Sequence, residues 1–165
     1  MATAACSSDE SSSDATAKTD AVHLAGDYTV TLVNFANSCP QDPNDPWMAG
    51  TTMDDVAFSI TQNGNSIRGE TMGGVAFAFL LKTGSPNFTG EVHGSHFVLE
   101  NHGTAPNQSE GCNYTLNVTI EGDLYEDAIV GTVTYKPIVE PTDACADYDC
   151  EVDQTFEGGR TVVEN

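Results

Sequence analysis

The chain has 165 residues and a formal net charge of −20 at pH 7, from 25 acidic and 5 basic side chains. This charge excludes a nucleic-acid-binding protein and a domain that docks on anionic lipid headgroups, because both need clustered Lys and Arg. With 39% hydrophobic residues the chain can still bury a core, and its length suits one domain, or one domain with a tail.

Residues 1–24 are rich in Ser, Ala, Thr and Asp and show no hydrophobic period. Such a composition cannot bury enough apolar surface to fold, so we predict a disordered N-terminal tether. Cys6 stands in it after two alanines and before a Ser/Asp-rich run, and it makes the cysteine count odd.

The arrangement around Cys6 resembles the processing site of bacterial lipoproteins, in which a signal peptidase cuts before a Cys that is then acylated. The resemblance implies lipidation of Cys6, a membrane partner through this anchor, and residence in the bacterial cell envelope. Ser7 implies the outer membrane, because Asp at that position signals retention in the inner membrane. Thr3 departs from the motif, which prefers an apolar residue there. The alternative is a free thiol in the tail.

From Gly26 onward the pattern changes to an alternation typical of half-buried strands. Residues 37–50 form a loop rich in Pro, Asp and Asn, and three hairpins are predicted around turns at 63–65, 93–95 and 122–123. The continuous apolar run 75–81 is predicted as a strand buried on both faces, and a last strand lies near 154–163. No segment shows a helical period, so little helix is expected.

Nine or ten antiparallel strands in sequential hairpins form a meander, and closing it into a barrel removes its edges. Residues 25–165 are therefore predicted as a single all-β domain, an antiparallel barrel of about 8–10 strands, with a β-sandwich as the alternative. The pattern resembles the lipocalin-like (calycin) barrels. Tyr28 in Gly26-Asp27-Tyr28 stands where those barrels carry Trp, and Arg160 stands for the late Arg that packs across that ring.

The four cysteines other than Cys6 are enough for two disulfides in an oxidising compartment. Cys39, Cys112, Cys145 and Cys150 allow three pairings. We favour Cys145–Cys150 across a short acidic loop, which leaves Cys39 to pair with Cys112. A zinc site is the weaker alternative, because no C-x-x-C pair exists.

Two histidines flank one predicted turn, His93 and His96, and could face each other within reach of one metal ion. Two imidazoles are too few for a closed zinc site, which takes four ligands. We therefore interpret them as exposed residues beside a turn, and we predict no metal and no cofactor.

Motifs of catalysis are missing from the sequence: it holds no G-x-S-x-G stretch and no glycine-rich phosphate loop. Neighbouring acids such as Asp54 and Asp55 would point to opposite faces of a strand. We predict that the chain is not an enzyme.

Two functions remain, both for a non-catalytic envelope protein of uncertain molecular role. The first is a binding module for a small apolar ligand, because barrels of about eight strands can hold one. The second is a structural or protein-interaction role without a ligand cavity. The predicted lining of such a cavity is apolar or aromatic and comprises Tyr28, Phe58, Phe77, Phe79, Phe88, Leu116 and Tyr135.

Overall fold

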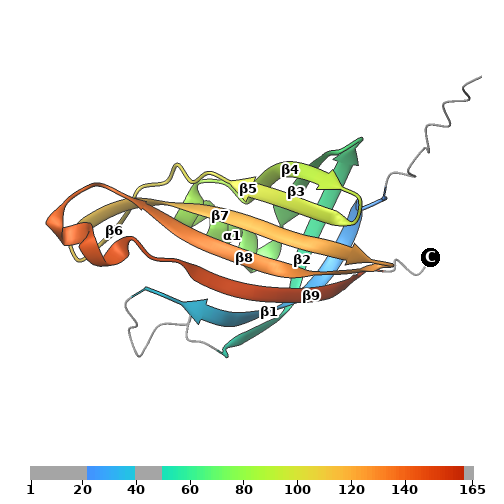
Figure 1. Cartoon of the computed structure of the whole chain (residues 1–165), viewed down its shortest axis with the longest axis horizontal. Helices are drawn as coiled ribbons and strands as arrows, with labels where there is room; N and C mark the ends of the chain where they lie inside the picture. The colour runs from blue at the N-terminus through green and yellow to red at the C-terminus, as the bar shows by residue number, and fades with distance from the viewer. Residues whose placement is uncertain (1–21, 40–49, 162–165) are drawn as a thin grey trace, which may run out of the picture.

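The computed structural model describes residues 22–39 and 50–161, and nearly all of its regular elements are antiparallel strands (Figure 1). One α-helix and one 3-10 helix interrupt them. The elements in chain order are β1 (Gly26–Asn37), β2 (Thr52–Asn63), β3 (Ser66–Thr71), α1 (Gly73–Thr83), β4 (Asn87–His93), β5 (His96–Asn101), β6 (Asn107–Ser109), β7 (Cys112–Tyr125), β8 (Ala128–Val139), η1 (Asp143–Tyr148) and β9 (Val152–Arg160).

Eight of the strands close into a barrel in sequential order, because β1 pairs with β9 and β5 pairs with β7. The short strand β6 lies outside this ring and pairs with the first residues of β7. The predicted all-β meander and its closure are thus confirmed, and the β-sandwich alternative is not adopted.

The core of the barrel follows from the period of two in each strand. In β1, Tyr28, Val30 and Leu32 are buried and face the interior, as the alternation predicts. In β2, Val56, Phe58 and Ile60 do the same. Every strand of the ring contributes at least one apolar side chain to the core, and closure leaves no unpaired strand edge within the ring.

The apolar run 75–81, predicted as a strand, forms most of helix α1 instead. Length and apolarity alone do not separate a buried strand from a helix. The segment contains Ala, Leu and Phe and one β-branched residue, and Gly84 ends it in the left-handed conformation, with its N–H bound to Leu80 O. Across the described residues, no helix has the length and apolarity needed to cross a membrane.

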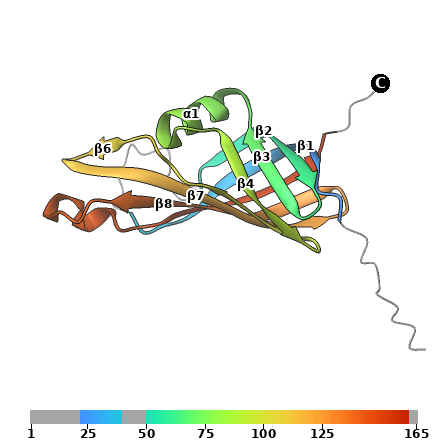
Figure 2. The same ribbon diagram turned by 90° about the horizontal axis from the view of Figure 1, so that it is seen from above.

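Helix α1 lies on one side of the strands, at the top of the view in Figure 2. Its residues Val75, Phe79 and Thr83, four positions apart, share the face that meets the barrel. The opposite face carries Phe77, which is 62% exposed. The helix therefore covers the barrel interior with one apolar face and shows a second apolar face to solvent.

The turn predicted at 122–123 lies farther along the chain, between β7 and β8, where Glu126 adopts a positive φ of 56°. Gly122 is instead a strand residue paired with Gly131. An ideal Cβ on either glycine would stand 2.8 Å from the Phe156 ring. The glycine pair therefore makes room for an aromatic ring in the core, and the turn itself uses no glycine.

Candidate functional site

One end of the barrel is closed by Arg160, which stands across the Tyr28 ring at 5.2 Å from guanidinium carbon to ring centroid. Its guanidinium donates hydrogen bonds to the carbonyls of Ala25 and His23, and its Nε lies 3.4 Å from Asp127. The Tyr28 hydroxyl donates to Leu24 O at 2.7 Å. This is the packing that the resemblance to lipocalin-like barrels implied, with Tyr in place of Trp.

The interior of the barrel is nearly filled. Below α1 it holds a cavity of about 40 Å³, which is room for one or two water molecules and well below the ~150 Å³ at which an apolar cavity admits benzene. Its lining is almost wholly apolar and comprises Val30, Leu32, Val56, Phe58, Thr71, Val75, Phe79, Phe97, Ile120, Ile129, Val133, Tyr135 and Phe156.

Three of the predicted lining residues border this cavity: Phe58, Phe79 and Tyr135. Tyr28 and Phe88 are buried elsewhere in the core, and Leu116 packs against the core from a partly buried position. Phe77 was predicted to line it and does not, because a helix rather than a strand carries it and turns it outward. The prediction missed the aliphatic lining residues, of which all but Val75 on α1 lie on strands, and it also missed Phe97 and Phe156.

Phe79 is the side chain of α1 that fills the interior. Its ring meets Phe88 edge-on at 5.4 Å and stacks on Tyr135 at 6.2 Å between centroids. Aromatic pairs at such separations stabilise a core beyond the area they bury. The helix thus acts as a plug that contacts both β4 and β8.

The C-terminal end of α1 is held by hydrogen bonds from the loops that follow α1 and β5 and from β6. The single Thr83 hydroxyl hydrogen lies between Phe79 O and Ser85 O, at 2.9 and 2.7 Å from Oγ1, and the N–H groups of Thr104 and Ala105 donate to Thr83 O. Asn107 Nδ2 donates to Lys82 O at 2.8 Å. These contacts fix the plug in place.

A short polar chain lies buried beside the cavity. The Tyr135 hydroxyl donates to Gln154 Oε1 at 2.7 Å, and Gln154 Nε2 donates to Asn34 Oδ1 at 2.6 Å. Burial raises the pKa of Tyr135 well above its usual range, so the phenol stays protonated at neutral pH. These two bonds give the Tyr135 hydroxyl and the Gln154 amide hydrogen-bond partners, and they link β8, β9 and β1 inside the barrel.

Thr71 differs: it is one of the residues that line the cavity, and its buried Oγ1 has no hydrogen-bond partner among the described residues. An unsatisfied buried hydroxyl costs about 1–3 kcal/mol. We therefore expect Thr71→Val to raise the free energy of unfolding by about 1 kcal/mol, measured by urea denaturation. Thr83→Val is the matched control, and it should lower the free energy of unfolding, because Thr83 is also buried and its hydroxyl is hydrogen-bonded. An unchanged or lower stability of Thr71→Val would show that the hydroxyl has a partner.

The four predicted cysteines all form disulfides, but the pairing that we favoured is wrong. Cys39 bonds to Cys150 and Cys112 bonds to Cys145. Because β1 and β9 are antiparallel neighbours, Cys39 just after β1 meets Cys150 just before β9. The pairing of Cys39 with Cys150 therefore follows from the closure of the barrel between its first and last strands.

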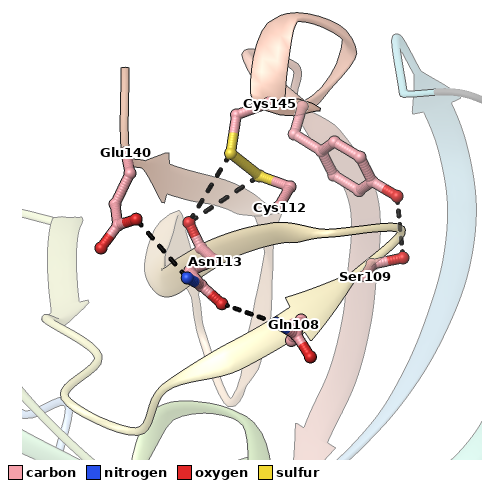
Figure 3. Close-up of a disulfide and its surroundings, with 7 residues drawn as sticks. Gln108, Ser109, Cys112, Asn113, Glu140 and Cys145 are labelled. Carbon is pink, nitrogen blue, oxygen red and sulfur yellow. Dashed lines mark hydrogen bonds between the residues drawn. A yellow bond between two sulfur atoms is a disulfide. The ribbon is translucent and has the colours of Figure 1, made fainter. Parts of the chain in front are cut away.

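The second disulfide fastens η1 to the start of β7 (Figure 3). Beside it, the Asn113 amide accepts a hydrogen bond from Gln108 and donates one to Glu140, at 3.1 and 3.5 Å. Two disulfides are consistent with an oxidising extracellular or envelope compartment.

His93 and His96 do face each other across the β4–β5 turn, as registered partners. Each is paired with acids: His93 lies 3.2 Å from Glu91, and His96 lies 3.3 Å from Glu121 and 3.5 Å from Asp123. Nowhere in residues 22–39 and 50–161 are three His, Cys, Asp or Glu side chains placed to hold a metal ion. Cys6 lies outside the described residues.

Comparison of the chain with family models, with curated proteins and with solved structures finds no match.

Proposed function

We propose that this chain is a non-catalytic lipoprotein of the bacterial cell envelope, anchored through Cys6 in the outer membrane, whose barrel acts through its outer surface. The observation that carries the surface role is the filled interior, with a cavity of about 40 Å³. Sites for small molecules usually measure ~300–1,000 Å³. The plug that fills the barrel is held by hydrogen bonds at Thr83 and Asn107.

The anchor is supported by the sequence around Cys6 and by the disulfide pattern. Both disulfides use the four other cysteines, so Cys6 is the one cysteine left for acylation. Residues 7–21 would then join the lipid to the domain, whose described part begins at Val22.

The binding of a small apolar ligand is the second candidate function. The apolar lining of the cavity and the unsatisfied Thr71 hydroxyl favour it, because one polar group in an apolar pocket suits an amphiphile. This role would require α1 to leave its place, and with it the Phe79 contacts to Phe88 and Tyr135.

One experiment tests the anchor and the surface role together. Expressed in a bacterium with its full upstream sequence, the protein should partition into the detergent phase, and Cys6→Ser should leave it in the aqueous phase. Native mass spectrometry of the purified protein should find the mass of acyl chains and no carried ligand.

Ser7→Ala is the control, because it alters the neighbouring residue and keeps the thiol. Aqueous behaviour of the unchanged protein would reject the anchor. An apolar molecule that leaves only on unfolding would reject the surface role in favour of the carrier.

A further inference from the structure

In the described part of the chain, exposed apolar side chains are concentrated on helix α1 and at its N-cap residue. The described residues include eight exposed large hydrophobic side chains, and four of these lie within residues 72–81: Met72 at 39%, Phe77 at 62%, Leu80 at 47% and Leu81 at 60%. Contiguous apolar patches on soluble domains commonly mark sites of interaction. We call these four residues the α1 patch.

The helical period places three of the four residues on one face of α1, and Met72 precedes the helix as its N-cap. Phe77, Leu80 and Leu81 are spaced i, i+3, i+4 and therefore share one face of the helix. The opposite face, with Phe79, is fixed in the barrel. Because that contact and the bonds of Thr83 hold the helix, the patch is presented on a rigid support.

The segment that carries the α1 patch has no acidic residues. No Asp or Glu occurs between Thr71 and Gly90, although the chain carries 25 acids, and Lys82 is the one charged residue of that segment. Carboxylates at such a face would oppose transfer into an apolar medium, since burying an unpaired charge is costly. Lys82 can lie along the helix and keep its ammonium group in water.

The area of the α1 patch favours a lipid surface over a second copy of the chain. Its four partly exposed side chains offer a few hundred Å² at most, whereas a stable protein interface buries about 800 Å² on each partner. Insertion of a helix face into the boundary between headgroups and acyl chains needs no such area, because affinity there scales with the apolar area buried.

The tether brings this face within reach of a bilayer, a step that rests on the proposed anchor. Fifteen residues, 7–21, separate Cys6 from Val22, and a chain of that length spans at most about 55 Å between these two residues. We propose that the α1 patch docks the barrel on the zwitterionic lipid surface to which Cys6 tethers it. A net charge of −20 disfavours anionic lipid, so neutral headgroups are the surface that fits.

The test uses the full chain with Cys6→Ser, so that no acyl chain contributes, and phosphatidylcholine vesicles in a flotation assay. The protein should float with the vesicles, and should float less when a third of the lipid is replaced by phosphatidylglycerol. Adding Phe77→Ser and Leu81→Ser should lower the partition coefficient by about tenfold or more, because each removes an exposed apolar side chain.

Tyr125→Ser with Ile138→Ser is the matched control, since these residues are 61% and 46% exposed on β7 and β8, and it should leave the partition coefficient unchanged. Circular dichroism checks that each variant folds. Absence of flotation, or an equal loss in both double variants, overturns the proposal. A dimer in sedimentation equilibrium that requires Phe77 and Leu81, without vesicle binding, overturns it in favour of a second copy.

The vesicle assay tests the α1 patch, and the detergent partition of the acylated protein tests the anchor, so either proposal can be rejected without the other. Loss of vesicle docking leaves the anchor at Cys6 untouched. A protein that docks on vesicles but never enters the detergent phase would retain the role of the α1 patch without the lipoprotein assignment.

Discussion

Replacing both Cys39 and Cys150 with serine is expected to lower the free energy of unfolding by about 4–5 kcal/mol. The disulfide joins residues 111 apart in sequence, and the entropy it removes from the unfolded chain grows with the logarithm of the loop length. It also ties β1 to β9 at the seam where the first and last strands of the barrel meet. Its loss removes the covalent link between β1 and β9, the neighbouring strands of the barrel that lie farthest apart in sequence.

The disulfide Cys112–Cys145 closes a loop of 33 residues and should contribute about 3–4 kcal/mol by the same relation. Comparing the two double-serine variants by urea denaturation tests this order. Beside Cys39, the Glu151 N–H also donates to Ser38 Oγ at 2.7 Å.

Thiol alkylation of the same variants tests the pairing. With Cys39 and Cys150 replaced, Cys112 and Cys145 stay bonded, and Cys6 is the one cysteine left to react when it is not acylated. Under the alternative pairing, Cys112 and Cys145 would each have lost their native partner and would be alkylated. Three alkylated cysteines in the folded variant would therefore contradict the structure.

The strands and the closure of the barrel were predictable because each strand carries its own period of two. Tyr28 and Arg160 were also recognisable from their positions at the two ends of the domain, and they meet at the barrel base. The disulfide pairing was not obtained, because spacing along the chain favoured Cys145 with Cys150. The register between first and last strands decides the pairing instead, and that register is non-local.

Helix α1 escaped prediction for a different reason. Residues 75–81 are apolar on every side, since one face fills the barrel and the other is exposed, so no amphipathic period exists to be read. The same ambiguity misplaced Phe77 in the cavity while correctly placing Phe79 there. The strand residues of the candidate site were thus predictable from the sequence, whereas the helical structure of residues 75–81 was not.

Phe79→Ala is expected to lower the free energy of unfolding by about 2–4 kcal/mol and to give the barrel an affinity for small apolar molecules. The ring is partly buried and contacts Phe88 and Tyr135, so its loss costs transfer energy and leaves a cavity. The space of a phenyl ring, added to the existing cavity of about 40 Å³, approaches the ~150 Å³ at which an apolar cavity binds benzene.

Phe77→Ala is the matched control, because it removes the same ring from the same helix at a position that is 62% exposed. Exposed substitutions of this kind usually change stability by no more than about 0.5 kcal/mol. Measuring the melting temperature with and without benzene separates the two effects. Benzene should raise the melting temperature of Phe79→Ala through binding to the native state, and it should leave those of Phe77→Ala and the unchanged protein as they are.

A benzene-dependent rise in the melting temperature of the unchanged protein would mean that the interior opens to ligands, because the filled barrel has no room for one. In that case the carrier role would replace the surface role, and α1 would be a lid that moves rather than a fixed plug.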